Sequence, residues 1–181
     1  MRDFDQIRRE LSLVNFVGSS NGNLFVVPVA PGAPRVVVRR FDRELPAGLI
    51  PAYASLLRAA GFWIERDPVL ARVVRVEQPT EIGLDFIARP HHLGTPLSSY
   101  SDDEDPAEPP DEFAPMQSRF RALTAAASEP RDTLVAEVLA RSILEPSGKT
   151  FYSFPESKFV VADIKPTRGE LERWAGLSPG D

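Results

Sequence analysis

The chain has no cysteine among its 181 residues. This absence excludes disulfides and thiolate metal sites. No apolar run approaches 18 residues, so no transmembrane helix is expected. The first ten residues, MRDFDQIRRE, are charged throughout and lack the apolar stretch of a signal peptide. These absences predict a soluble, cytoplasmic protein with no membrane partner.

Lysine is scarce, and acidic charge is concentrated in one segment. The only lysines are Lys149, Lys158 and Lys165, whereas residues 98–114 hold seven of the 26 acidic residues, three prolines and no basic residue. Such a composition cannot bury enough apolar surface to offset the entropy lost on ordering. We therefore expect an acidic, proline-rich linker over 98–114. The chain outside it is near neutral, which argues against a broad nucleic-acid-binding face.

The first 97 residues predict an α+β domain with the element order α-βββ-α-βββ. The segment MRDFDQIRRELSLV has apolar residues at helical spacing behind Asp3, a favourable N-cap, which indicates a helix over 3–13. Apolar runs on both sides of Asn21-Gly22 indicate a hairpin, and Gly61 is expected to end the next helix. Short connections favour one antiparallel sheet with helices on one face. The remaining elements are strands over 35–40, 62–66, 71–77 and 83–89 and a helix over 49–60, with Leu57 and Trp63 buried.

Residues 115–181 predict a second, smaller unit with the order helix-helix-hairpin-helix. Apolar spacing indicates helices over 116–127 and 132–144, and two β-rich runs, 150–154 and 159–163, indicate a hairpin. Thr167 followed three residues later by Glu170 forms a capping box, which predicts a final helix over 168–175.

Two short strings match catalytic motifs only in part. Residues 18–22 read G-x-S-x-G, the string of a hydrolase nucleophile elbow, for which Asp85 and His91 could complete a triad by chain order. The motif requires a helix after the serine, and a strand is predicted there, so a hairpin turn is favoured. Residues 147–150 end like a phosphate-binding loop but lack its first glycine and its following helix.

Metal sites are also weakly indicated. His91 and His92 are the only histidines, and adjacent residues at a strand end point in opposite directions. The acidic run Asp102–Asp105 alternates like a calcium loop but lacks its glycine and its distal glutamate. A loop and a solvated acidic segment are the favoured interpretations.

The string Asp163-Ile164-Lys165, which follows an apolar strand, resembles the end of the PD-(D/E)xK nuclease signature. That resemblance implies that Asp163 and an upstream acid, with Glu156 the nearest, hold Mg²⁺ while Lys165 orients the attacking water. Period-2 geometry would place Asp163 and Lys165 on one face, and Mg²⁺ prefers carboxylate oxygens. The competing interpretation makes both residues surface charges at a strand end.

The order of the first elements is similar to that of the small acidic chaperones of type III secretion. This resemblance implies a non-catalytic, chaperone-like module that binds an extended chain of a partner protein, and strand edges could accept such a chain. We therefore expect a protein-binding or assembly module, homo-oligomerisation included, with no catalytic residue and no cofactor. The alternative is a Mg²⁺-dependent nuclease or nucleic-acid-binding protein that uses Glu156, Asp163 and Lys165.

Overall fold

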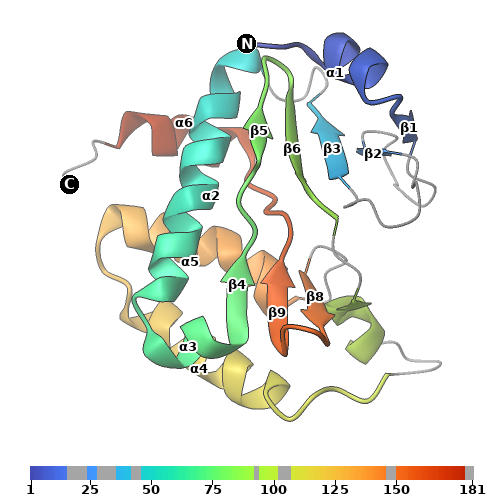
Figure 1. Cartoon of the computed structure of the whole chain (residues 1–181). Helices are drawn as coiled ribbons and strands as arrows, with labels where there is room; N and C mark the ends of the chain where they lie inside the picture. The colour runs from blue at the N-terminus through green and yellow to red at the C-terminus, as the bar shows by residue number, and fades with distance from the viewer. Residues whose placement is uncertain are drawn as a thin grey trace. The chain divides into compact units, whose positions relative to one another are not determined.

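The computed structural model describes residues 1–15, 24–27, 36–41, 46–91, 94–101, 107–145 and 150–177. The α+β class is confirmed, with a five-stranded antiparallel sheet, a four-stranded mixed sheet and helices packed on sheet (Figure 1). Contacts divide the chain into two compact units. Unit 1 comprises Met1–Ala54 and Gln78–His91, and unit 2 comprises Ser55–Glu77 and His92–Asp181. The units interleave along the sequence, whereas the predicted division was consecutive.

Unit 1 is built on the antiparallel sheet, in which Val38 pairs with Ala88 at the centre. Helix α1 (Phe4–Glu10) covers the face that carries Val38, and its Phe4 and Ile7 are buried against that face. The Phe4 and Phe25 rings lie 4.5 Å apart. The strands, in sheet order, are β1 (Val14–Asn15), β2 (Leu24–Val26), β3 (Val36–Arg40), β6 (Phe86–Pro90) and β5 (Glu81–Ile82).

Local capping fixes the start of α1, as the sequence predicts. The Asp3 carboxylate accepts from the Gln6 backbone N–H at 2.8 Å, and Gln6 Oε1 accepts from the Asp3 N–H at 3.1 Å. The helix ends at Glu10, three residues before the predicted end. The predicted hairpin turn over 18–22 lies outside the described residues, but β1 and β2 on either side of it pair antiparallel.

Unit 2 contains the mixed sheet, in the order β4-β9-β8-β7. The predicted hairpin is present as β8 (Thr150–Ser153) and β9 (Lys158–Val161). It is extended on both sides, by β7 (Thr95–Pro96) and by β4 (Val74–Val76), which runs parallel to β9. A self-contained C-terminal hairpin was expected, and this larger sheet takes its two outer strands from earlier in the chain.

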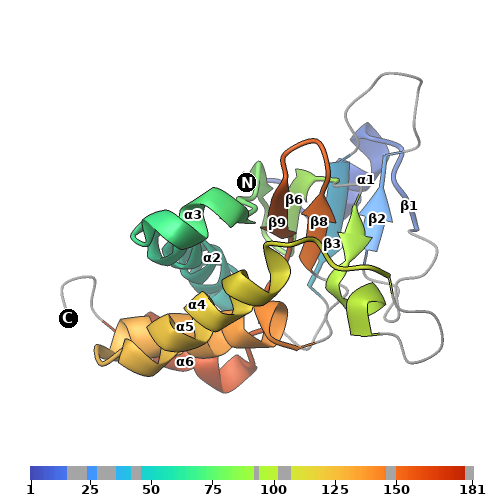
Figure 2. The same cartoon turned by 90° about the horizontal axis from the view of Figure 1, so that it is seen from below.

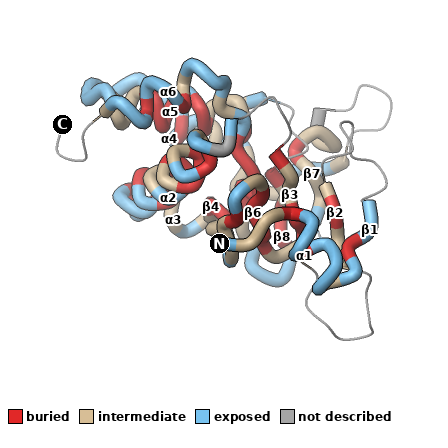
Figure 3. Tube along the Cα trace, turned by 90° about the horizontal axis from the view of Figure 1, so that it is seen from above, coloured by how far each residue is buried: buried red, intermediate tan, exposed pale blue. Residues whose placement is uncertain are grey.

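The remaining regular structure of the described chain is helical. Helix α5 lies beside α4 and α6, and its predicted apolar face is buried (Figures 2 and 3). None of the helices within the described ranges is long and apolar enough to cross a membrane. The helices are α2 (Ile50–Glu65), α3 (Pro68–Val73), α4 (Phe113–Ala126), α5 (Pro130–Ile143) and α6 (Arg168–Gly176), with short 3-10 turns η1 (Ala47–Leu49) and η2 (Leu97–Ser101).

One predicted strand is wrong, and a second is only partly present. Residues 62–65 of this predicted strand instead continue α2 through Gly61, because Trp63 and Ile64 are buried as helical neighbours and this packing outweighs the helix-breaking tendency of glycine. Most of the predicted strand 71–77 is split between α3 and β4, since Asp67 caps a helix that begins at Pro68. The predicted strand over 83–89 is present as β6, which begins three residues later than expected and ends one residue later. Trp63 and Leu57 are both buried, as predicted.

The predicted linker over 98–114 contains regular structure at both ends. Turn η2 occupies its first residues, and α4 begins at Phe113 within its last two. The Tyr100 and Phe113 rings lie 5.4 Å apart, so apolar contacts join the two ends. The acidic run Asp102–Asp105 lies outside the described residues.

Candidate functional site

The three residues of the D-x-K hypothesis do not gather at one point. Glu156 lies in the turn before β9, and Asp163 follows the other end of that strand. The four residues of β9 separate them by roughly 10 Å or more, because a strand rises about 3.3 Å per residue. Glu156 is instead bound to Arg75, whose Nη2 and Nε lie 2.9 and 3.0 Å from its carboxylate oxygens.

Asp163 is buried, with 1% of its surface exposed, so the prediction that it is a surface charge is wrong. Its Oδ1 accepts from the Ile164 N–H at 2.9 Å, and its carbonyl oxygen accepts from Ser142 Oγ at 3.4 Å. Thr150 Oγ1 donates to the Ser142 carbonyl at 2.7 Å. These bonds join the end of β9 to α5 and β8. Lys165 is exposed, as predicted.

The other residues considered as hydrolase, metal or phosphate-loop candidates either have a structural role or lie outside the described residues. Asp85 Oδ1 accepts from the Phe4 N–H at 2.7 Å, which places its charge at the positive end of α1. His91 is half-buried, and His92 and residues 146–149 lie outside the described residues. Thr150 opens a strand, whereas a phosphate-binding loop needs a helix there.

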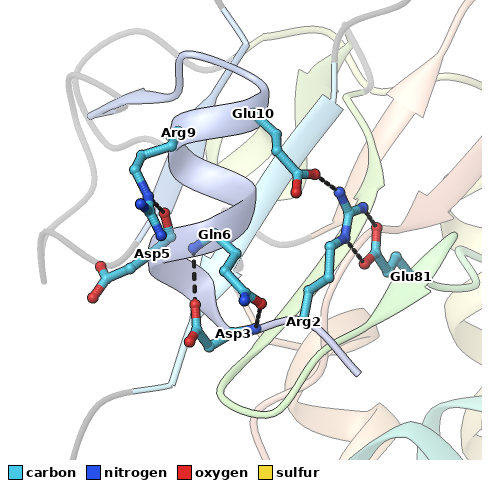
Figure 4. Close-up of polar contacts among 7 residues, drawn as sticks. All are labelled: Arg2, Asp3, Asp5, Gln6, Arg9, Glu10 and Glu81. Atoms are coloured by element: carbon cyan, nitrogen blue, oxygen red, sulfur yellow. Dashed lines mark hydrogen bonds and ion pairs between the residues drawn. The ribbon is translucent and has the colours of Figure 1, made fainter.

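Several acidic side chains elsewhere form ion pairs with arginine. Arg2 lies between Glu10 and Glu81 and forms ion pairs with both, next to the Asp3–Gln6 capping box (Figure 4). The hydrogen bond to Glu81 ties the start of the chain to β5, and it raises the pKa of Arg2. Within the described ranges, no group of three or more histidine, aspartate or glutamate side chains could hold a metal ion.

A pocket of about 180 Å³ lies in unit 2, among α2, α5 and α6. Phe62 stands at this pocket with 67% of its surface exposed, although its neighbour Trp63 is buried. Trp63 packs edge-on against Phe120 of α4 at 5.6 Å, which fixes one wall. We call this the Phe62 pocket; its lining is Ala59, Phe62, Trp63, Arg66, Arg131, Asp132, Val135 and Trp174.

Charged side chains of the lining are held in place around its aromatic rings. The Arg131 guanidinium lies 4.0 Å from the centre of the Trp174 ring, and its Nη1 donates to the Leu177 carbonyl at 2.9 Å. Arg66 Nη2 donates to Asp132 at 2.7 Å. The lining therefore carries two arginines and one aspartate, an excess of positive charge.

Sequence analysis did not identify this pocket. Phe62 was assigned to a strand, and the helical spacing of Ala59, Phe62 and Arg66 was not recognised. No protein-family model matches the chain, and a search of the curated proteins finds no match.

Proposed function

We propose that the chain is a non-catalytic protein-binding module whose Phe62 pocket receives one large apolar side chain from an acidic segment of a partner protein. The observation that carries this proposal is the exposure of Phe62 beside an aromatic-lined cavity. Large aromatic side chains packed into pockets are the usual energetic centres of protein interfaces. The module acts in the cytoplasm, as the sequence predicts, in a chaperone-like or assembly role.

The size of the pocket favours a side chain over a small-molecule substrate. Sites for drug-sized ligands usually enclose about 300–1,000 Å³, whereas this pocket encloses about 180 Å³. An engineered cavity of about 150 Å³ binds benzene. The Phe62 pocket thus suits a group about the size of a phenyl ring, such as the side chain of phenylalanine or leucine.

The charge of the lining favours acidic residues beside that anchor. Arg66 and Arg131 come from two helices, and Asp132 already accepts a hydrogen bond from Arg66. A carboxylate of the partner that approaches this positively charged edge would gain charge-assisted hydrogen bonds. Charge complementarity of this kind selects among partners that carry similar apolar anchors.

The alternative of a Mg²⁺-dependent nuclease has less support. A magnesium site needs its carboxylates around one ion, and Glu156 and Asp163 lie at opposite ends of β9. Glu156 is also engaged by Arg75. These contacts support structural roles for both acids.

Selection of a random peptide library on the immobilised full chain tests the proposal. We expect enriched peptides to share one large apolar residue flanked by aspartate or glutamate. Phe62→Ser should weaken their binding at least about tenfold, as loss of an interface anchor does. Phe154 is 68% exposed and lies on the β8–β9 turn, so Phe154→Ser is the matched control and should bind like the wild type. No enrichment, or equal loss in both variants, would contradict the proposal.

A second copy of the chain is the competing occupant of the pocket. Light scattering coupled to size-exclusion chromatography distinguishes the two cases. We expect the same mass for the wild type and Phe62→Ser. A wild-type dimer that Phe62→Ser converts to a monomer would show that the pocket is a homo-oligomer interface.

A further inference from the structure

Two tryptophans of the Phe62 pocket have indole N–H groups without a hydrogen-bond acceptor. Trp63 is 7% exposed and Trp174 is 3% exposed, so each residue is more than nine-tenths buried. Neither Nε1–H donates a hydrogen bond to any residue in the part of the chain that the structure describes. A buried tryptophan N–H usually has an acceptor, and an unsatisfied donor is unfavourable. A ligand in the pocket that both rings line can supply the missing acceptors.

The ring contact of Trp174 does not use its N–H. The Arg131 guanidinium lies over the ring, 4.0 Å from its centre, and so stacks on the face. The N–H lies in the plane of the ring, at its edge. Because Trp174 forms part of the pocket wall, a group that fills the pocket lies against this ring and can bring an acceptor to it.

Arg66 adds charged donors to the same lining. Its Nη2 donates to Asp132 at 2.7 Å, whereas its Nε and Nη1 donate to no residue within the described ranges. The side chain of Arg66 is 61% exposed, so it lies on the solvent side of the pocket. A guanidinium has five N–H donors in a planar fork. Arg66 can therefore bind a second oxyanion while it holds Asp132.

The acceptor has to enter the pocket together with the apolar anchor, because a phenylalanine or leucine side chain carries none. Within a chain, the peptide unit that follows the anchor offers one neutral carbonyl oxygen. At the end of a chain, the α-carboxylate is attached to the same Cα as the side chain and offers two oxygens and a negative charge. Two separate indole donors and a nearby guanidinium favour the carboxylate. Capture of a C-terminal carboxylate is a recurring mode of peptide recognition.

On the basis of the protein-binding function given above, we propose that the Phe62 pocket recognises the C-terminal residue of its partner. The apolar side chain of that residue fills the pocket, and its α-carboxylate accepts from the indole N–H groups of Trp63 and Trp174 and from Arg66. The acidic residues of the partner segment then precede the anchor. An anchor within a chain binds more weakly, because hydrogen bonds to a neutral carbonyl are roughly half as strong as those to a carboxylate.

Calorimetric titration of the full chain with two peptides tests the role of the carboxylate. Acetyl-Asp-Asp-Glu-Phe with a free C-terminus and acetyl-Glu-Asp-Asp-Glu-Phe amide carry the same net charge, so their difference reports the terminal carboxylate alone. We expect the free acid to bind at least about tenfold more tightly. Equal affinities would overturn this proposal and leave the protein-binding function in place. Absence of binding by both peptides would contradict both proposals.

Substitutions in the lining test which donors hold the carboxylate. Trp174→Phe keeps an aromatic ring but removes the N–H, and Arg66→Gln removes the guanidinium, so each should lower the preference for the free acid at least about threefold. Arg58→Gln, at an exposed position of α2 outside the lining, should keep the wild-type preference. Thermal unfolding checks that each variant is folded, and the two peptides on the wild type decide the matter if Trp174→Phe is not. An unchanged preference in both lining variants, or an equal loss in Arg58→Gln, would overturn the proposal.

Discussion

The Arg131 guanidinium stacks on the Trp174 ring at 4.0 Å and so joins the start of α5 to α6 at the edge of the Phe62 pocket. The same side chain reaches the Leu177 carbonyl just beyond the end of α6. A cation at that position also interacts favourably with the negative end of the helix. One arginine therefore fixes an aromatic wall of the pocket and the end of α6.

Replacement of this arginine should loosen α6. Arg131→Ala removes both the cation–π contact and the hydrogen bond, so the free energy of unfolding should fall by about 1 kcal/mol. Arg121→Ala, an exposed arginine of α4, should change it by less than about 0.5 kcal/mol. Urea denaturation followed by circular dichroism measures both values. Equal stability of the Arg131→Ala variant and the wild type would show that the stacking does not contribute to folding.

Leu57 tests the packing of α2. It is fully buried on the helix, whereas its neighbour Arg58 is exposed. Leu57→Ala should lower the free energy of unfolding by about 2–5 kcal/mol through lost burial and the cavity left behind. Arg58→Ala, at the next position, should cost less than about 0.5 kcal/mol. A Leu57→Ala loss below about 0.5 kcal/mol would mean that this side of α2 does not form the core in solution.

Asp67 caps α3 and binds Arg119. Its Oδ1 accepts from the N–H groups of Leu70 and Val69 at 2.9 and 3.1 Å, and Arg119 Nε donates to Oδ2 at 3.0 Å. Asp67→Ala should lower the free energy of unfolding by about 0.5–2 kcal/mol, the usual cost of a lost N-cap. Asp67→Asn should cost less, because asparagine retains a capping oxygen.

Acid should reduce the contribution of Asp67. The hydrogen bond from Arg119 lowers the pKa of Asp67, aided by the backbone N–H groups, although burial acts in the opposite direction. Its stabilising effect is therefore complete above the ordinary aspartate pKa of about 4 and is lost as pH falls through the lowered folded-state value. The stability difference between the wild type and Asp67→Asn should shrink below about pH 4 in urea titrations. A difference that grows in acid would contradict this assignment.

Asp163 and Lys165 should respond very differently to substitution. Asp163→Ala removes a buried acceptor and should cost about 1–3 kcal/mol, whereas Lys165→Ala should change stability by less than about 0.5 kcal/mol. Neither the wild type nor Lys165→Ala should cut plasmid or single-stranded DNA in the presence of Mg²⁺. Cleavage by the wild type that EDTA and Lys165→Ala both abolish would support the nuclease alternative.

Features set by a few neighbouring residues were predictable from the sequence. Thr167 Oγ1 accepts from the Glu170 N–H at 3.2 Å, and α6 begins directly after Thr167, the N-cap of this capping box. Helices α4 and α5 and the β8–β9 hairpin also appear near their predicted positions. In each case, turn or cap chemistry and apolar spacing indicate the same element.

Features that depend on distant segments were not predictable. Phe62-Trp63-Ile64 is β-like by composition, but burial of Trp63 and Ile64 keeps it helical. Asp67 and Pro68 fall between the predicted strands 62–66 and 71–77, although aspartate before proline is a strong helix start and begins α3 here. The Phe62 pocket combines α2, α5 and α6, so no local pattern could indicate it.

The most direct test of the protein-binding proposal uses the chain's own tryptophans. Trp63 and Trp174 are its two tryptophans, and both line the Phe62 pocket, so intrinsic fluorescence reports on this site. The probe is a capped peptide, Asp-Glu-Phe-Glu-Asp, and Asp-Glu-Ala-Glu-Asp is its control. We predict a saturable change in tryptophan emission with the phenylalanine peptide, which Phe62→Ser weakens at least about tenfold and Phe154→Ser leaves unchanged. Unchanged emission with both peptides, or the same response to each, would contradict the proposal.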